Sequence, residues 1–146
     1  CIFCEMPVKD VVVWTLMLKG FVKSGNWSMA VEHFNQMMAI EEVELDSVAL
    51  IAMLSGCSSS GALQQGRRVH ALVIKVGFED DTFLGSSIID MYANCAKLGD
   101  ARRFFKGMAE KDAACWNALI SGSGMHGYCN DAIDLFLKMK DLGIDP

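Results

Sequence analysis

Apolar residues recur along this chain at intervals of three and four over most of its length. Val31, Phe34 and Met37 form one such series. This spacing places apolar side chains on one face of a helix, whereas a half-buried strand would alternate apolar and polar residues. Proline, which breaks helices, occurs only at Pro7 and Pro146. The pattern therefore predicts an all-α protein built from short amphipathic helices.

The periodic stretches fall into pairs separated by short glycine-containing turns, which is typical of helical hairpins. We expect the first helix of each pair over about 12–24, 48–59, 83–95 and 114–126. We expect the second helix over about 27–40, 63–76, 98–108 and 129–142. The turns are expected at or near Gly25, Gly61, Gly99 and Gly127.

The sequence also repeats itself. A shift of 102 positions aligns ten identical pairs, among them Trp14 with Trp116 and Phe34 with Phe136. Within this period, units that end at Asp46, Asp81 and Asp112 are 36, 35 and 31 residues long. Because one helical hairpin cannot bury its apolar face alone, such repeats stack and share a continuous core. The repeat predicts a solenoid of stacked helix-turn-helix units.

Two places in the repeated unit indicate how the hairpins pack. Small residues occupy one place in the second helix, where they allow the two helices of a hairpin to approach closely: Ala30, Gly66, Ala101 and Ala132. Trp14 and Trp116 share a place in the first helix. Since both tryptophans recur in register, we interpret them as core residues.

Composition excludes several classes of protein. With 146 residues, 52% hydrophobic residues and a net charge of -5, the chain is too apolar for a disordered protein and has no basic tail. The longest central apolar run, Val48 to Leu54, is far too short for a membrane span, so no membrane partner is expected. The chain opens at Cys1 without a leader pattern, and we expect it to be part of a longer protein.

The sequence contains no recognisable catalytic motif. His33, His70 and His126 are never followed two places later by glutamate, as zinc deaminase chemistry requires, and no phosphate-binding loop is present. Cys1 and Cys4 form a CxxC-like pair without a second pair behind it. A zinc or redox site there is one interpretation; small buried hydrophobic residues are the other. We predict no enzyme activity, no metal site and no cofactor.

The repeat resembles the pentatricopeptide repeat family over the whole chain. The stretches "VVVWTLMLKGFVKSGNWSMAVEHFNQM" and "SSIIDMYANCAKLGDARRFFKGMAEKD" are similar to its P and S variants. The resemblance implies a right-handed α-solenoid divided into a preceding S-type tail (1–10), a P repeat (11–46), an L repeat (47–81), an S repeat (82–112) and a truncated P repeat (113–146). The alternating lengths resemble the land-plant PLS subclass.

This resemblance implies a module that binds single-stranded RNA, about one base per repeat, in a mitochondrial or chloroplast RNA-editing or processing factor. Editing-complex proteins are expected to bind through regions outside this chain. In the family, the residues at the fifth and at the last place of each repeat select the base. Here the fifth-place residues are Thr15, Ile51, Ser86 and Asn117, and the last-place residues are Asp46, Asp81 and Asp112. Second-place residues wedge between bases; here they are Val12, Val48, Phe83 and Ala114.

The family's pattern implies a preference for G-x-G-pyrimidine. Thr15 with Asp46 and Ser86 with Asp112 would favour guanine, Asn117 a pyrimidine, and Ile51 cannot hydrogen-bond a base. Phosphate contacts usually dominate affinity, and this acidic chain offers few cations near the first helices. The expected phosphate neighbours are Lys19, Lys23 and Lys97.

Alternative interpretations remain for the same residues. Aspartate before a helix is a common N-cap, so Asp46, Asp81 and Asp112 could simply start the next helix. Thr15 and Ser86, like Asn117, could be ordinary solvated helix residues. At the level of the whole chain, the alternative to RNA binding is a scaffold for proteins, similar to tetratricopeptide repeats.

Overall fold

The computed structural model describes residues 11–40, 45–78 and 80–146, and within these ranges every regular element is a helix. The helices are α2 (Val11–Lys23), α3 (Trp27–Ala39), α4 (Ser47–Ser60), α5 (Leu63–Lys75), α6 (Thr82–Asn94), α7 (Leu98–Gly107), α8 (Ala113–Met125) and α9 (Cys129–Asp141). The all-α prediction is confirmed. The predicted repeat tail at 1–10, with the Cys1–Cys4 pair, lies outside the described residues.

The helix boundaries agree with the sequence pattern to within one residue at each end. The agreement has a local cause, since each first helix after the first hairpin begins directly behind an aspartate N-cap. The four hairpins lie within the expected units 11–46, 47–81, 82–112 and 113–146. The assignment of these units to P, L and S types stays a prediction. None of the described helices is long and apolar enough to cross a membrane.

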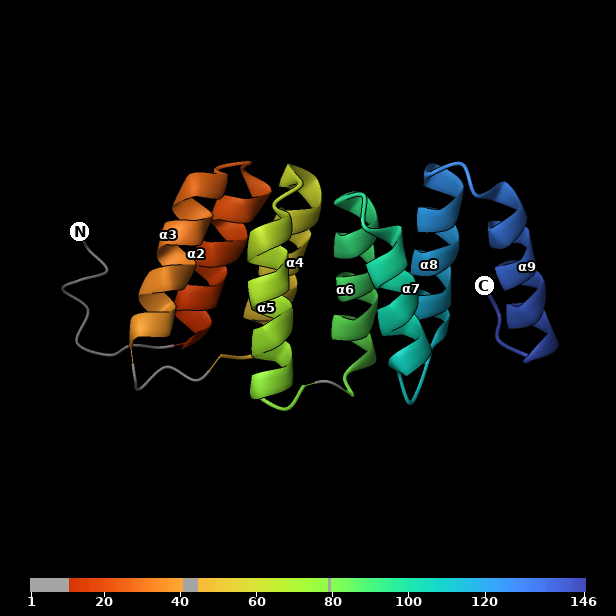
Figure 1. Ribbon diagram of the computed structural model, residues 1–146. Coiled ribbons are helices and arrows are strands. Elements are labelled where there is room, and N and C mark those ends of the chain that lie inside the picture. The colour runs from red at the N-terminus through yellow and green to blue at the C-terminus, as the bar shows by residue number, and fades with distance from the viewer. Residues whose placement is uncertain (1–10, 41–44, 79) are drawn as a thin grey trace.

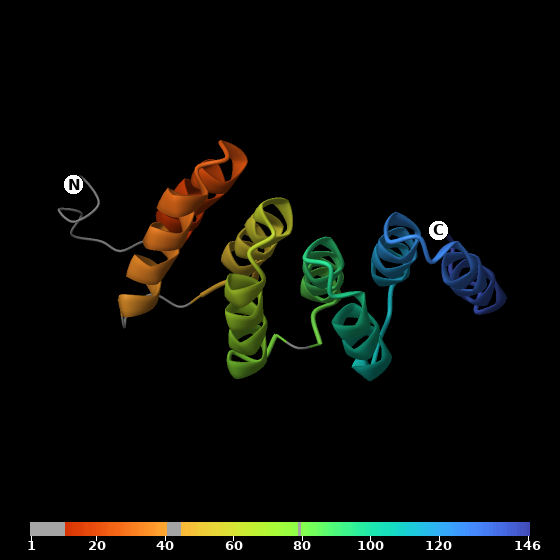
Figure 2. The same cartoon turned by 45° about the horizontal axis from the view of Figure 1, so that its top comes forward.

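The hairpins stand side by side in one row, with α2 and α3 at one end of that row and α9 at the other (Figure 1). The first helices α2, α4, α6 and α8 pack consecutively against one another, and each second helix packs on its own first helix. The turned view separates α5 and α7 from α4 and α6 as a second layer (Figure 2). This arrangement is an α-solenoid, as the repeat predicts.

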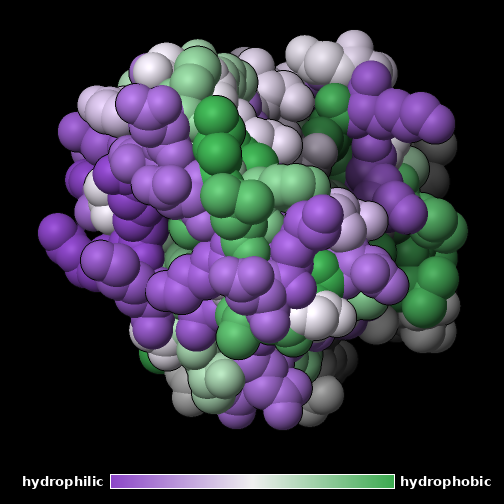
Figure 3. All heavy atoms as spheres, turned by 90° about the vertical axis from the view of Figure 1, so that its right-hand side faces the viewer, coloured by the Kyte–Doolittle hydropathy of each residue, from purple (hydrophilic) through white to green (hydrophobic). Residues whose placement is uncertain are grey.

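The core lies between the first helices and the inner sides of the second helices. Both α4 and α6 are buried on two flanks because a hairpin packs on either side of each. At the end of the row, α9 buries only Met139. Phe136 is 38% exposed, although Phe34 and Phe105 at the same place in earlier units are 3% and 5% exposed. An apolar stripe is visible on this end of the molecule (Figure 3), where α9 also exposes Ile133 and Leu137.

Gly66, one of the small residues of the second helices, lies close to a neighbour that the sequence did not predict. A Cβ atom at Gly66 would collide with the Met91 side chain of α6, whose sulfur is the nearest atom. The small residue therefore makes room for the following hairpin, while its expected role between the two helices of one hairpin stays a prediction. Trp14 and Trp116 are buried, which confirms their interpretation as core residues.

The turns inside the hairpins share one backbone geometry. The residue two places before each second helix has a positive φ: 77° at Gly25, 67° at Gly61 and 83° at Gly127. In the third hairpin this place is taken by Ala96, with φ 60°. Gly99, which we expected near that turn, lies inside α7. The prediction is wrong there because an alanine holds the left-handed conformation that glycine adopts without steric cost.

Replacing Ala96 with glycine is expected to stabilise the protein by about 0.5–1 kcal/mol. The change relieves a left-handed alanine, which costs about 1–2 kcal/mol, and part of that gain is lost to the greater freedom of glycine in the unfolded chain. Urea denaturation followed by circular dichroism measures the effect. The matched change, Gly61→Ala, introduces the same strain at the equivalent place and should lower the midpoint. A lower midpoint for Ala96→Gly would contradict this account.

Candidate nucleic-acid interface

A row of apolar side chains lies exposed at the start of the first helices. Val12 is 56% exposed, Val48 43% and Phe83 72%, and Ala114 is exposed as well. These are the second-place residues of the four units. Apolar side chains that stay accessible at the same place in consecutive helices form a set of parallel surfaces on which flat, aromatic ligands can stack.

The last-place aspartates start the following helices. The Asp46 Oδ1 atom accepts a hydrogen bond from the Ala49 amide at 2.9 Å. The Asp81 carboxylate accepts from two amides of α6, and Asp112 Oδ1 accepts from the Cys115 amide at 3.0 Å. The N-cap interpretation is therefore confirmed for all three. It does not exclude a second role, because a carboxylate has acceptor sites on both oxygens.

The environment of Asp112 favours the ionised carboxylate. Burial pushes its pKa upward, but hydrogen bonds from Cys115 and Thr82 outweigh this effect and hold the pKa below its usual value. The group is therefore an acceptor only at neutral pH. Such a carboxylate can receive a hydrogen bond from an amino or imino group of a base.

The fifth-place residues lie three positions after the second-place residues, and so on the same side of each helix. Their surroundings differ strongly. Thr15 is 4% exposed, and its Oγ1 donates to Asp46 Oδ1 at 3.5 Å. The structure thus brings the predicted pair together but buries the threonine. A ligand on the open surface meets this pair through the half-buried Asp46.

The other fifth-place residues are more accessible. Ser86 is half-buried and donates its hydroxyl proton to the Phe83 carbonyl at 2.9 Å, which leaves its oxygen as an acceptor. Asn117 is exposed, with a donor and an acceptor at its amide. Ile51 is half-buried against the core. The alternative interpretation, in which Thr15, Ser86 and Asn117 are ordinary solvated residues, is wrong for Thr15.

Positive charge near this surface is concentrated at its N-terminal end. Lys19 and Lys23 are exposed on α2, seven and eleven residues after Val12 and so along the same stripe. Lys97 is exposed at the start of α7. On α6 the place of Lys19 is taken by Asp90, an exposed acidic residue. A polyanion would therefore be attracted at α2 and repelled at α6.

Two arginines of the second helices form ion pairs between hairpins. Arg67 of α5 lies 3.5 Å from Asp100 of α7, and Arg102 of α7 lies 2.7 Å from Asp131 of α9. In both pairs the arginine and the aspartate occupy the same places of consecutive units. We did not predict these pairs, although the recurrence of arginine and aspartate at these places is visible in the sequence. Arg103 also pairs with Asp100. The Arg67 and Arg102 pairs thus link neighbouring second helices, whereas the Arg103 pair lies within α7.

The histidines have structural partners. His33 bonds the Trp14 carbonyl oxygen and His70 bonds the Tyr92 hydroxyl, both at 2.8 Å. Burial lowers the pKa of His33 and of His70, so both rings are neutral at pH 7. His126 bonds the Ala93 carbonyl oxygen. No cluster suited to a metal ion occurs among residues 11–40, 45–78 and 80–146.

Comparison with known proteins finds the same repeat. A family model described as PPR repeat matches residues 12–40 and 114–144. A pentatricopeptide repeat-containing protein of Arabidopsis thaliana, named as mitochondrial, is 37% identical over 94% of the chain and 22% of its own length. A chloroplastic one from the same plant is 34% identical over 99% of the chain and 22% of its own length. The chain thus spans about a fifth of these relatives.

The fold has a counterpart among solved structures. The crystal structure of a pentatricopeptide repeat protein from maize superposes with a TM-score of 0.73 and covers 95% of this chain and 20% of the maize chain. The sequences are 18% identical in that comparison, so this likeness concerns the fold. The shared fold is the row of stacked hairpins seen in Figure 1.

Proposed function

Because the chain carries pentatricopeptide repeats, we propose that it binds single-stranded RNA along the open side of its first helices, at about one base per repeat. The observation that carries the proposal is the row of second-place side chains. Val12, Val48, Phe83 and Ala114 remain exposed at the same place of four consecutive first helices. An RNA strand that crosses the row would insert these side chains between successive bases.

Base selection is proposed to reside next to this row. Ser86 and the ionised Asp112 together supply the acceptors that the amino and imino groups of guanine require. Asn117 supplies an amide suited to a pyrimidine, and Ile51 supplies no hydrogen bond. With Thr15 and Asp46 as the first pair, the proposed preference is G-x-G-pyrimidine. The net charge of -5 makes weak binding at physiological salt the expectation for this chain alone.

The cellular role follows from the relatives and is likewise a proposal. Relatives that align with nearly the whole chain are named as mitochondrial or chloroplastic proteins of a plant. We propose an organellar RNA-editing or processing factor of the PLS subclass, located in one of these organelles. Editing-complex proteins would bind the parts of the full protein that lie outside this chain.

Exchanging the first selecting residue is expected to change the preferred base. In the Thr15→Asn variant, the amide beside Asp46 should favour uracil over guanine at the first base, a reversal of about 1–2 kcal/mol in relative affinity. Fluorescence anisotropy at low salt, with oligonucleotides that carry G-A-G-U or U-A-G-U, measures it. Ser86→Asn, at a more accessible site, should make the same change at the third base.

The control for this experiment is Ile51→Val. This change keeps an aliphatic side chain in the unit that is expected to make no base-specific hydrogen bond, so base preference should stay as in the parent protein. If both asparagine variants bind RNA with the parent's preference, the assignment of selecting residues is wrong. If the parent protein binds neither oligonucleotide better than a scrambled one, sequence-specific RNA binding is wrong.

A further inference from the structure

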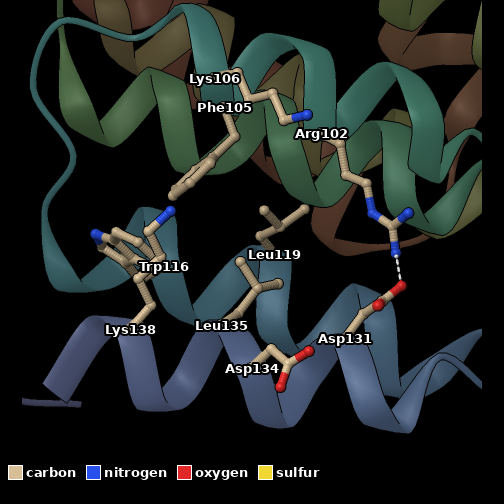
Figure 4. Close-up of a pocket in the computed structure, with 9 residues that line it drawn as sticks. All are labelled: Arg102, Phe105, Lys106, Trp116, Leu119, Asp131, Asp134, Leu135 and Lys138. Atoms are coloured by element: carbon tan, nitrogen blue, oxygen red, sulfur yellow. Dashed lines mark hydrogen bonds and ion pairs between the residues drawn. The ribbon is translucent and has the colours of Figure 1, made fainter. Parts of the chain in front are cut away.

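A groove separate from the row of second-place residues lies between the second helices α7 and α9, with α8 as its floor (Figure 4). Its volume is about 360 Å³. It exists because α7 and α9 each pack on α8 and do not pack against each other. The lining residues are Arg102, Phe105, Lys106, Trp116, Leu119, Asp131, Asp134, Leu135 and Lys138.

The floor of the groove is apolar. Phe105 and Trp116 meet edge to face, with ring centroids 4.9 Å apart, and Leu119 and Leu135 continue the surface. Phe105 and Trp116 are 5% and 4% exposed. The accessible apolar part of the groove is therefore provided mainly by the half-buried Leu135 beside these rings, and it suits one aliphatic or aromatic side chain.

Hydrogen-bond donors around this floor lack acceptors. The Trp116 Nε1 atom is buried and has no hydrogen-bond partner in the part of the chain that the structure describes. Lys106 and Lys138 are exposed, and neither forms an ion pair with another described residue. Among the nine lining residues, only Arg102 and Asp131 are joined by an ion pair (Figure 4). A ligand with a negatively charged acceptor would complement the two exposed lysines.

The other charges of the groove identify the class of ligand. Asp131 and Asp134 lie on the α9 wall. Asp131 is paired with Arg102, and Asp134 repels any anion beside it, so the groove accepts a single carboxylate at the lysines more readily than the continuous line of phosphates of a nucleic acid. An acidic peptide carries single carboxylates beside apolar side chains, which matches two free ammonium groups beside an apolar floor. We propose that this groove docks a short acidic segment of a partner protein, with a carboxylate at Lys106 and Lys138 and an apolar side chain on Phe105 and Leu135.

This docking site is compatible with RNA binding on the other side of α8. Ala114, Asn117 and Ser121 share one exposed face of this helix, because they are three and four residues apart. Trp116 and Leu119 are buried and line the groove between α7 and α9. A peptide in the groove therefore leaves the proposed base-selecting face open, and the two functions can be tested separately.

The test uses the 146-residue chain and a fluorescein-labelled peptide, Leu-Glu-Glu-Leu-Phe, with Leu-Gln-Gln-Leu-Phe as the neutral counterpart. Anisotropy should show binding of the acidic peptide and about tenfold weaker binding of the neutral one. In parallel, the indole N–H signal of Trp116 in a two-dimensional NMR spectrum, assigned with Trp116→Phe, should shift with the acidic peptide.

Variants identify the groove. Replacing Lys106 and Lys138 together with glutamine should weaken the acidic peptide about tenfold, whereas Lys140→Gln, which alters a lysine over the Phe136 ring, should not. Equal binding of both peptides, or unchanged binding by the double variant, overturns the proposal. If a single-stranded RNA displaces the peptide and shifts the Trp116 signal, the groove is a nucleic-acid site and the proposal is wrong. Failure of RNA binding on the opposite face has no bearing on these outcomes.

Discussion

Replacing Gly122 with valine is expected to destabilise the protein by about 3 kcal/mol, at the upper end of the range for overpacked cores. A Cβ atom at Gly122 would lie 2.8 Å from the Cβ of Ala93 in α6 and 3.5 Å from a methyl group of Leu98. The Ala93 methyl is fixed to the backbone and cannot rotate away. The helices α6 and α8 would therefore have to separate, which opens the packing along the row of first helices.

Gly124 provides the matched control in the same helix. It is exposed, and a Cβ there would meet nothing within 4 Å. Gly124→Val should leave stability unchanged or raise it slightly, because glycine disfavours the helical state. Thermal unfolding followed by circular dichroism should separate the variants by about 6–12 °C. Equal midpoints would show that α6 and α8 are not packed as closely as the structure has them.

Replacing Phe83 with alanine is expected to weaken RNA binding by about 1–3 kcal/mol, which corresponds to roughly 5- to 150-fold in Kd. Phe83 is 72% exposed and belongs to the row of second-place residues, so its ring is available for stacking. It is the only aromatic residue in that row, and alanine leaves no ring. Anisotropy with an oligonucleotide carrying G-A-G-U measures the loss.

Two controls accompany this variant. Ile133→Ala removes a similarly exposed apolar side chain from α9, outside the row, and should bind RNA as the parent does. Val48→Ala removes a smaller side chain within the row and should cause a smaller loss than Phe83→Ala. Since Phe83 is mostly exposed, the melting temperature of its variant should stay near the parent's. Unchanged RNA affinity of Phe83→Ala would place the RNA, if it binds, on another surface.

The regular part of the fold could be predicted because its signals are local. The three-and-four spacing of apolar residues and the aspartate before each later first helix fix the helices to within one residue. The turn of the third hairpin could not be predicted in this way. Ala96 holds φ 60° there, although nothing in its residue type favours that conformation. Packing of α6 and α7 imposes the turn on it, and Gly99 is left inside the helix.

The sequence indicates which positions of each repeat belong to the candidate site, but not which of these positions are accessible. Register in the repeat brings Thr15 and Asp46 to within 3.5 Å, as pairing of the fifth and last places anticipates. That Thr15 is buried whereas Asn117 is accessible could not be predicted, because exposure depends on which neighbouring side chains cover each position. The groove at Trp116 also escaped prediction, since its walls come from two different hairpins.

The amino-acid sequence by itself determined the helices, their pairing into hairpins and the order in which they stack, because each of these depends on spacing within some 35 residues. Tertiary structure alone decided which polar side chains remain accessible and that Gly66 makes room for Met91 of the next hairpin. It also decided that Trp116 keeps a buried N–H without an acceptor among the described residues. The physical reason is that the exposure of a side chain and the contacts between hairpins depend on residues that are distant in the chain, and a local sequence pattern contains no information on these.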